Sequence, residues 1–372
     1  MATDLAVFLA TSGHSGVDRL ARNLIPALAR RGYSIDLLKV RNHGPHLDDC
    51  PAGVRVIDLG TRHVYSSLGA VAHYLRKNNP RAMFCDKDRV NHTALLARAM
   101  AGVSTRLTLS MGTTVSIDLA HRGALHRLKT RLSMGWLYRL ADNVIVTSDG
   151  VADDMARYTG LPRHLINVVP CPIIPAHVFE GPFPTPDHPW FSDNGPPIIM
   201  GLGELGSRKD FVTLIRAFAQ IRPEFPCRLM IIGRGRDRER LLATAHELGV
   251  ADAFELPGFV DAPYAWLAQA SLFAFTSLWE GLGFALIEAL AVGIPSVSTD
   301  CPSGPREILG DGRYGPLVPV GDHAALAQAM LQTLRHPLPK ATLQEAAWPY
   351  EIERATTAYA EALGLGQPSA AR

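Results

Sequence analysis

Short apolar runs alternate with amphipathic stretches along the first 170 or so residues of the chain. "LAVFLAT" and "SIDLLKV" are typical of buried strands, and "GVDRLARNLIPALARRG" between them has the spacing of an amphipathic helix that ends at Gly32. The alternation continues through "VRVIDLG", "RAMFCD", "STRLTLS" and "NVIVTS". Strands that alternate with helices predict a parallel sheet that is covered on both faces.

A proline-dense segment without periodicity lies between Pro170 and Pro197, and it predicts a linker. A second alternating series follows, from "PIIMGLG" through "CRLMIIG", "FELPGFV" and "LFAFTS" to "PSVST", and "EIERATTAYAEALG" closes the chain as a helix. We therefore predict two Rossmann-like α/β domains in tandem. The predicted boundaries are 1–175 for the first domain, 176–196 for the linker, 197–345 for the second domain and 346–372 for the closing helix and tail.

Composition places the chain among ordinary globular proteins, with 47% hydrophobic and 19% charged residues in a length of 372. Its five cysteines are scattered and form no C-x-x-C pair, which argues against a disulfide framework or a zinc site and suits a reducing cytosol. The opening "MATDLAVFLATSG" carries Asp4 and lacks a basic start, so it predicts a first strand rather than a signal peptide. We expect a cytoplasmic protein.

The net charge of +2 hides an asymmetry along the chain. Residues 1–140 hold 20 Lys and Arg against 9 Asp and Glu, whereas residues 141–372 hold 17 against 26. A basic first half indicates an anionic partner there, and we do not expect that partner to be a nucleic acid.

Part of this basic charge lies in residues 121–140, "HRGALHRLKTRLSMGWLYRL". A helix that packs on the core with a basic outer face would explain the pattern. Docking on anionic lipid, or on a lipid-phosphate acceptor, would explain it as well. Apolar residues recur at helical spacing and basic residues lie between them: Leu125, Leu128, Leu132, Trp136 and Leu140, with Arg122, Arg127, Lys129 and Arg131.

The segment "TSLWEGLGFALIEALAVGIPSVST" contains the most informative chemistry. Ligands of open α/β sheets bind beyond the carboxyl ends of the strands, where loops lead into helices. Gly281 and Gly283 lie in such a loop and allow close backbone approach to a ligand. The following helix start carries partial positive charge and predicts an anion site for a phosphate or diphosphate.

Glu288 is the single polar residue in "FALIEALAV", a helix that is apolar all round and therefore predicted to be buried. A buried carboxylate is costly unless it accepts hydrogen bonds or pairs with a cation. Two explanations remain open at this point. Glu288 either forms a structural salt bridge or accepts hydrogen bonds from ligand hydroxyls such as the diol of a ribose.

The spacing from Glu280 to Glu288, with "ALAVGIPSVSTDCPSGPREIL" and "GRYGPLVPVGD" after it, resembles the nucleotide-sugar site of the retaining glycosyltransferases of family 4. Further stretches resemble the family in the same order along the chain. The resemblance implies the GT-B fold, in which the last helix crosses back onto the first domain, and a bacterial enzyme of polysaccharide or glycolipid assembly. These stretches are "ADNVIVTSDGVADDMARYTGLP", "RKDFVTLIRAFAQI", "LMIIGRGRDRERLLATAHELGV" and "ELPGFVDAPYAWLAQASLFAFTS".

The resemblance also implies residue roles. The second glutamate of the motif, Glu288, would hold the nucleotide ribose, and the first, Glu280, would lie beside the donor sugar. Lys209 matches the family's diphosphate lysine, whereas Glu204 stands where the family has an arginine, and Arg208 is the candidate replacement. The implied catalytic residues are Glu280, Lys209 and Arg208, and the implied donor-binding residues are Glu288, Gly283, Phe284, Ala285, Leu286, Gly258, Phe259 and Val260.

Three features of the first domain also bear on function. The turn "TSGHSGVDRL" resembles the family's glycine-rich loop, with Gly13 and Gly16 as candidates for an acceptor or phosphate loop. Met111 stands where the family tends to have a histidine. "DKD" at residues 86–88 imitates a D-x-D metal motif, but we interpret it as a solvated loop and expect no metal site.

These observations predict a retaining hexosyltransferase that uses a UDP-sugar as donor and a saccharide, lipid-linked or small-molecule acceptor. No cofactor and no essential metal are expected. Two alternatives stay open: a nucleotide-sugar epimerase of the same architecture, and a non-catalytic nucleotide-sugar-binding protein, which Glu204 and Met111 favour. Residues 121–140 add peripheral contact with the inner face of a membrane as a further expectation.

Overall fold

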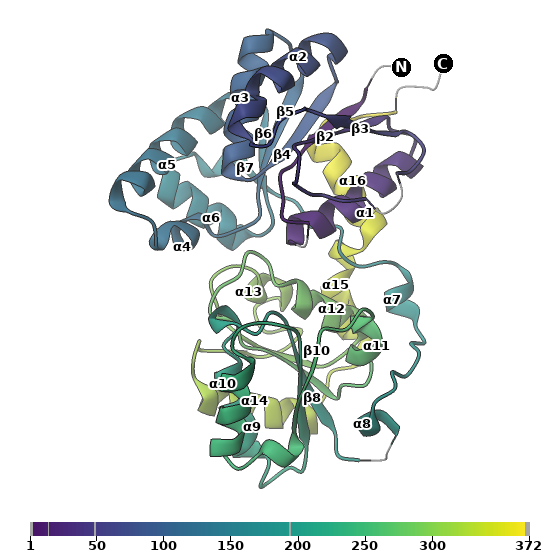
Figure 1. The fold of residues 1–372 in the computed structure, drawn as a ribbon. Coiled ribbons are helices and arrows are strands. Elements are labelled where there is room, and N and C mark those ends of the chain that lie inside the picture. Colours follow the sequence, from purple (N-terminus) through teal and green to yellow (C-terminus); the bar gives the residue numbers. More distant parts are fainter. Residues whose placement is uncertain (1–2, 14, 48–49, 193–194, 369–372) are drawn as a thin grey trace. The chain divides into compact units, whose positions relative to one another are not determined.

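The computed structural model describes residues 3–13, 15–47, 50–192 and 195–368, and the chain divides into two compact units. Unit 1 comprises Met1–Ile173 with Tyr350–Arg372, and unit 2 comprises Ile174–Pro349. Each unit is a parallel sheet with helices on both faces (Figure 1). The predicted fold class, two Rossmann-like α/β domains, is therefore confirmed.

The sheet of unit 1 has seven strands in the order β3-β2-β1-β4-β5-β6-β7. The strand order reverses between the neighbours β1 and β4, which makes that position the topological switch point of unit 1. The strands are β1 (Leu5–Phe8), β2 (Ile35–Lys39), β3 (Val54–Asp58), β4 (Ala82–Asp86), β5 (Arg106–Met111), β6 (Asn143–Val146) and β7 (Ile166–Val168). The helices are α1 (Gly16–Arg30), α2 (Leu68–Asn78), α3 (Asp88–Ala101), α4 (Val115–Ala120), α5 (Ala124–Leu137), α6 (Asp149–Thr159) and α16 (Ile352–Ala362).

The sheet of unit 2 has six strands in the order β10-β9-β8-β11-β12-β13, with its switch point between β8 and β11. The strands are β8 (Ile198–Leu202), β9 (Arg228–Ile232), β10 (Phe254–Gly258), β11 (Leu272–Phe275), β12 (Ser296–Thr299) and β13 (Leu317–Val318). The helices are α7 (His177–Glu180), α8 (Pro189–Ser192), α9 (Phe211–Ile221), α10 (Arg238–Glu247), α11 (Pro263–Leu267), α12 (Phe284–Val292), α13 (Pro305–Ile308), α14 (His323–Arg335) and α15 (Lys340–Ala347).

The predicted strands are apolar because both of their faces are covered by helices. β1 (LAVF) and β11 (LFAF) are buried at every position, as the central strands of a parallel sheet should be. The strands that the patterning did not predict, β7 and β13, are edge strands of three and two residues. They are too short to give a periodic signal.

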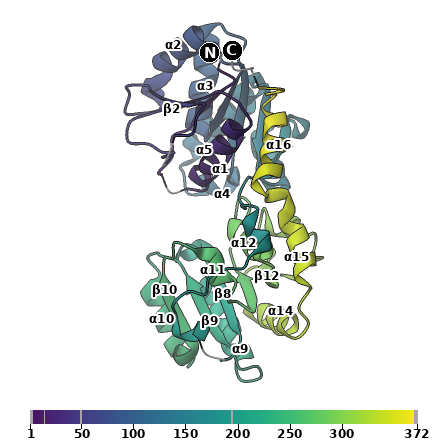
Figure 2. The ribbon, with the colours of Figure 1, turned by 90° about the vertical axis from the view of Figure 1, so that its right-hand side faces the viewer.

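The last helix of the chain returns to unit 1, as the resemblance predicted. α16 packs against α1, and Figure 2 shows the two helices side by side. Tyr359 of α16 is buried and its ring meets the edge of the Phe84 ring in β4 at 6.0 Å between centroids. The interaction explains why the closing helix is amphipathic.

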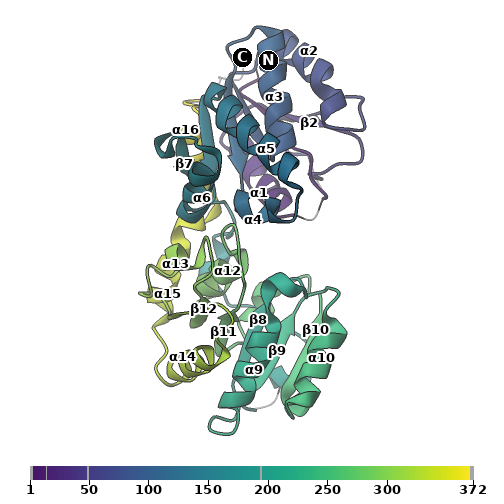
Figure 3. The same ribbon diagram turned by 90° about the vertical axis from the view of Figure 1, so that its left-hand side faces the viewer.

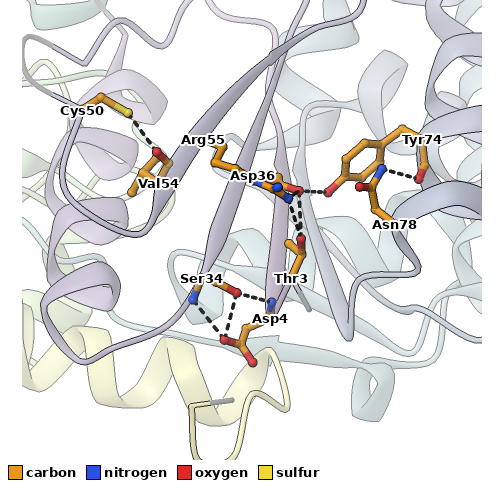
Figure 4. Close-up of polar contacts among 9 residues, drawn as sticks. All are labelled: Thr3, Asp4, Ser34, Asp36, Cys50, Val54, Arg55, Tyr74 and Asn78. Carbon is orange, nitrogen blue, oxygen red and sulfur yellow. Dashed lines mark hydrogen bonds and ion pairs between the residues drawn. The ribbon is translucent and has the colours of Figure 1, made fainter. Parts of the chain in front are cut away.

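The amino edge of the unit 1 sheet is fixed by a buried polar network (Figure 4). The Asp36 carboxylate accepts hydrogen bonds from Thr3 Oγ1 at 2.9 Å, from Tyr74 at 2.6 Å and from two nitrogens of the Arg55 guanidinium. Burial alone would raise the pKa of Asp36, but these donors outweigh it, and the pKa is lowered. This network is structural, since it lies at the edge opposite to the one where ligands bind in such sheets.

The proline-rich segment predicted as a linker is counted with unit 2 from Ile174 onward. Phe179 of α7 stacks on Trp348 with 4.5 Å between ring centroids. His188 lies among Trp190, Phe191 and Trp266, so the described part of this segment packs on unit 2 through aromatic rings. Within the described ranges, no helix has both the length and the apolar character that a bilayer crossing requires.

Candidate functional site

The residues predicted from the Glu280–Glu288 motif gather at the carboxyl edge of the unit 2 sheet. The loop after β8 carries Arg208 and Lys209, and the loop after β11 carries Glu280 and leads into α12. β8 and β11 are neighbours in the sheet, so the two loops leave the switch point side by side. This is the position at which open α/β sheets bind their ligands.

Glu280 holds the two predicted cations together. Its carboxylate accepts one hydrogen bond from Lys209 Nζ and one from an Arg208 guanidinium nitrogen, each at 2.7 Å. The Lys209 and Glu280 side chains are only 10% and 7% exposed, whereas the Arg208 side chain is 39% exposed. Arg208 is therefore on the solvent side of the cluster, and Lys209 is the cation that is out of water.

Backbone contacts fix the position of this cluster. The Leu278 amide donates to the Arg208 carbonyl at 2.8 Å, and Thr276 Oγ1 donates to the Lys209 carbonyl at the same distance. Gly203 has a φ of +156°, and a β-carbon there would lie 2.8 Å from Lys209 Cε. Because Gly203 has no side chain, the lysine stem can lie along the end of β8.

The charge state of Glu280 follows from these contacts. Burial alone would raise the pKa of Glu280, but the Lys209 and Arg208 cations and the hydrogen bonds from Lys209 and Ser277 lower it below its usual value. Glu280 is thus a carboxylate over the whole physiological range. The cluster has two cations and one anion, and its net positive charge suits an anionic ligand.

α12 begins without a side-chain cap. Gly283 is the N-cap residue with a φ of +109°, and α12 has no acidic residue in its first turn. Glu288 lies in the second turn with its side chain buried, as predicted. Ala285 and Leu286 are also buried, and the Leu286 side chain lies fully within the core, so any ligand contact of Leu286 would be made by its main chain.

The predicted base-contacting residues lie at the same edge of the sheet. Gly258 ends β10 with a φ of +96°, and its carbonyl accepts from the Gly233 amide at the end of β9. Phe259 is exposed, and the Arg234 guanidinium lies 5.0 Å from its ring centroid. Val260 follows in the loop. The structure therefore places the residues predicted to bind the donor at the end of β10 and in the loop and helix that follow β11.

The unit 1 switch point is built differently. Gly13 precedes α1 with a φ of +91°, and Gly16 is the first residue of α1. Ser15 and Asp18 form a capping box, in which the Asp18 carboxylate accepts from the Ser15 amide at 2.7 Å and from the Ser15 hydroxyl at 2.6 Å. Asp18 also accepts from the Thr11 hydroxyl, so the helix start already has its own anion.

Sequence reasoning did not identify Asp18, although the signal was present. Ser15-x-x-Asp18 has the spacing of a capping box, with an acidic residue at the third helical position. The glycines on either side of Ser15 drew attention to a ligand loop instead. A β-carbon at Gly44 would lie 2.5 Å from an Asp18 oxygen, which shows how closely the chain surrounds this carboxylate.

The interpretation of "DKD" as a solvated loop is wrong. Asp86 is the last residue of β4 and is buried, and burial raises the pKa of its carboxyl despite a hydrogen bond with Ser110. Asp88 begins α3 and accepts from the Tyr138 hydroxyl at 3.1 Å. A buried strand end cannot be distinguished from a loop by a short polar run.

Two further positions correspond to departures from the family pattern. Glu204 is exposed in the loop after β8, and Met111 ends β5 half-buried. A cavity of about 620 Å³ lies at the amino end of β12, lined by residues such as Ser296, Tyr314 and Leu343, and it contains none of the predicted site residues. The described part of the chain contains no cluster of three His, Cys, Asp or Glu side chains that could hold a metal ion.

Comparisons with protein families match most of the chain in two parts. Residues 15–172 match the profile described as "Glycosyl transferase 4-like domain". Residues 196–336 match the profile described as "Glycosyl transferases group 1". The two matched regions lie in unit 1 and unit 2, respectively.

Two curated relatives are named as glycosyltransferases. A Campylobacter jejuni protein is 27% identical over 348 residues, 88% of each chain, and is named N-acetylgalactosamine-N,N'-diacetylbacillosaminyl-diphospho-undecaprenol 4-alpha-N-acetylgalactosaminyltransferase. The lipopolysaccharide 1,6-galactosyltransferase of Escherichia coli is 28% identical over half of each chain.

Among solved structures, Anabaena HepE in complex with UDP superposes with a TM-score of 0.78 at 15% identity, over 97% of this chain and all of that chain. The apo form of the lipopolysaccharide outer core galactosyltransferase WaaB superposes with a TM-score of 0.76 at 18% identity, over 97% of this chain and 99% of that chain. Identities this low show a shared fold.

Proposed function

The chain is a glycosyltransferase of the family-4 type with the GT-B fold, and from this premise we propose that it transfers a hexosyl group, with retention of anomeric configuration, from a UDP-sugar to a saccharide, lipid-linked or small-molecule acceptor. The C. jejuni relative, which it matches over 88% of both chains, is named as an alpha-transferase that acts on a diphospho-undecaprenol acceptor. The similar Anabaena fold is described in complex with UDP.

One observation carries the proposal: the cluster of Lys209, Arg208 and Glu280 at the unit 2 switch point, next to the start of α12, which has no acidic residue in its first turn. A nucleoside diphosphate brings negative charge that this edge can neutralise with two side-chain cations and the helix dipole. Lys209 is the stronger contributor because it is nearly out of water, where electrostatic interactions are least screened.

The proposed reaction breaks the bond between C1 of the donor sugar and the β-phosphate oxygen. The bond's electron pair leaves with the diphosphate, and Lys209, Arg208 and the start of α12 stabilise the charge that develops there. The acceptor hydroxyl attacks C1 on the same face, and its proton passes to a leaving-phosphate oxygen. The products are the glycosylated acceptor and UDP, and the balance requires neither a cofactor nor a metal ion.

Glu288 is proposed to hold the ribose. It lies one turn deeper in α12 than the helix start that would face the diphosphate, and its side chain is buried. Phe259 and the main chain of Gly258 and Val260 are proposed to contact the base. In this arrangement, Glu280 orients Lys209 and Arg208 in the free enzyme and lies next to the sugar when the donor is bound.

The acceptor is proposed to bind unit 1, which carries most of the basic surplus. A cytoplasmic reaction at the membrane surface would suit a lipid-linked acceptor.

The test is a panel of UDP-sugars incubated with the purified chain, with UDP release and sugar products measured by chromatography. We expect slow UDP release without acceptor and an α-linked product with acceptor, and neither should change when EDTA is added. Lys209→Ala should lower the rate of UDP release by about 10²- to 10³-fold, whereas Arg216→Ala, which removes an exposed cation from α9, should leave it intact.

Other outcomes would identify the alternatives. Formation of an epimeric UDP-sugar without UDP release would identify an epimerase. Binding of UDP-sugars without any turnover, with or without acceptors, would identify a nucleotide-sugar-binding protein. An inverted product anomer, seen by NMR, would contradict retention alone.

A further inference from the structure

The outer face of α5 exposes an apolar stripe that no part of unit 1 covers. Trp136 is 81% exposed, and the four leucines of the stripe are between 51% and 66% exposed. They recur three or four positions apart and therefore share one side of the helix. We define this stripe by its five residues: Leu125, Leu128, Leu132, Trp136 and Leu140.

The opposite face of α5 shows that the helix is firmly seated. Thr130, Met134 and Gly135 are buried, and a β-carbon at Gly135 would lie 2.4 Å from the Thr159 carbonyl oxygen of α6. Tyr138, just beyond α5, is buried and accepts from Asn91 of α3 at 3.0 Å. The core therefore uses the other side of α5, and the interpretation of the stripe as core-facing is wrong.

α5 lies on the outside of unit 1 next to α3 and α6 (Figure 3). Removing a side chain as large as Trp136 from water is favourable, because burial of its apolar surface lowers the free energy. Five such side chains in one row form an exposed patch of the kind that marks a site of interaction with a protein or a membrane.

The basic side chains of α5 and its preceding turn lie before and between the residues of the stripe along the sequence, and this segment has no acidic residue of its own. Arg122, Arg127, Lys129 and Arg131 are all exposed, and none forms an ion pair with another described residue. The sequence has no Asp or Glu between Asp118 and Asp142. The partner of this face must therefore accept apolar side chains in its interior and supply negative charge around them.

We propose that the outer face of α5 docks on the surface of an anionic bilayer. The stripe would enter the boundary between headgroups and acyl chains, while the lysine and arginine stems extend so that their charges meet lipid phosphates. A second copy of the chain fits this face less well, because a two-fold contact would bring Lys129 and Arg131 of both copies together with no carboxylate between them. The inference rests on the proposed function in one respect: it would place the acceptor-binding unit where a lipid-linked acceptor is located.

The first test is co-sedimentation of the full chain with vesicles of phosphatidylcholine alone and of phosphatidylcholine mixed with phosphatidylglycerol. We expect binding to the mixed vesicles that weakens as salt is added. Leu128→Gln with Trp136→Gln should reduce vesicle affinity about tenfold or more. The matched control, Leu242→Gln with Leu248→Gln, changes two exposed leucines of unit 2 and should bind like the parent.

Charge is tested separately from apolar contact. Lys129→Gln with Arg131→Gln should lower affinity for the mixed vesicles by about fivefold per charge. Lys77→Gln with Arg216→Gln removes the same charge from exposed positions on α2 and α9 and should have little effect.

Trp136 also reports directly on the contact. Its fluorescence should shift to the blue on addition of mixed vesicles, and the shift should be absent from Trp136→Phe, which should still bind. If Trp136→Phe shows the same shift as the parent, the signal comes from another tryptophan and the proposed orientation is refuted.

Two results would overturn the proposal. One is equal binding of the parent and Leu128→Gln/Trp136→Gln to mixed vesicles. The other is a parent protein that does not bind vesicles but forms a concentration-dependent dimer in light scattering, when this double variant stays monomeric. That result would assign the stripe to contact with a second copy of the chain. UDP release from the donor in solution should be the same in the double variant and the parent, so a failed docking proposal is distinguishable from a failed transferase proposal.

Discussion

The switch points of the two units have the same topology but different helix starts. In unit 1, α1 and α3 each carry a carboxylate in the first turn, Asp18 and Asp88. In unit 2, α9 has Asp210 at its N-cap, whereas α12 starts at Gly283 and has no acidic residue in its first turn. The chain thus places a carboxylate at both helix starts of the unit 1 switch point, whereas in unit 2 the first turn of α12 has none to offset the partial positive charge of the helix start.

The difference shows that a parallel sheet provides the place for a ligand but not the chemistry. Both edges have glycines at positive φ, Gly13 in unit 1 and Gly283 in unit 2. In unit 2, two cations and one carboxylate leave a net positive charge at the edge. This difference supports the proposal that the diphosphate binds unit 2, and a phosphate role for Gly13 and Gly16 stays an untested prediction.

The largest effect should come from Lys209. Lys209→Ala removes the cation that is nearly out of water, and we expect turnover to fall by about 10²- to 10³-fold, as for loss of one preorganised transition-state donor. UDP affinity should fall much less than turnover. Arg208→Ala, which removes the solvent-side cation, serves as the matched comparison and should lower turnover by a smaller factor. Equal effects of the two substitutions on turnover would contradict the assignment.

Glu288 should have the next largest effect, on binding. Glu288→Ala should weaken UDP affinity by about 10- to 100-fold, because a hydrogen bond to a charged group contributes about 1.5–3 kcal/mol. Calorimetric titration with UDP measures it, and thermal unfolding checks that the buried substitution leaves the chain folded. Glu247→Ala, which changes the exposed last residue of α10, is the control. A folded Glu288→Ala protein with the parent's UDP affinity would rule out the ribose role.

Asp18 should matter for stability and not for the donor. Burial alone would raise the pKa of Asp18, but hydrogen bonds from Ser15 and Thr11 and the charge of Lys87 lower it. Because the pKa of Asp18 is lower in the folded state, its carboxylate stabilises the fold at pH values above the unfolded-state pKa of about 3.9. This contribution is lost as the pH falls through the folded-state pKa.

Asp18→Asn should therefore destabilise the chain by about 1–2 kcal/mol at neutral pH, and by less as the pH falls below about 4. Thermal unfolding across this pH range measures the difference, with the exposed Asp153→Asn as control. UDP affinity should not change. A clear change in UDP affinity would mean that the unit 1 helix start also takes part in donor binding, and the comparison between the units would fail.

The smallest effect concerns Glu204, the exposed residue at the family's arginine position. Glu204→Arg removes a negative charge near the cluster and adds a positive one, so donor affinity should rise, but only up to about fivefold because exposed charges are well screened. Steady-state kinetics with varied donor measures it. Glu204→Gln should give an intermediate value, and a loss of affinity in both variants would show that Glu204 itself contributes to the site.

Two kinds of feature could be predicted from the sequence: strands with a strong hydrophobic pattern, and a helix start marked by several functional residues close together. The central strands were predicted because burial on both faces makes them continuously apolar, and Glu280 and Glu288 because two carboxylates and two glycines frame a single helix start. Asp86 was misjudged because "DKD" looks the same at a buried strand end and in a loop.

The face of α5 could not be predicted either. Its apolar stripe has the periodicity of a core-packing helix, and the residues that anchor α5 are Thr130, Met134 and Gly135, which are less hydrophobic than the stripe itself. Only the structure shows which of the two sides is covered. The pairing of Arg208 and Lys209 on Glu280 likewise joins residues about 70 positions apart, which a local pattern does not specify.

The most direct measurement is a crystal structure of the chain soaked with UDP. We predict ribose hydroxyls within hydrogen-bonding distance of the Glu288 carboxylate, with the diphosphate at the start of α12 and against Lys209. UDP bound at the start of α1, or bound elsewhere with Glu288 out of contact, would contradict it.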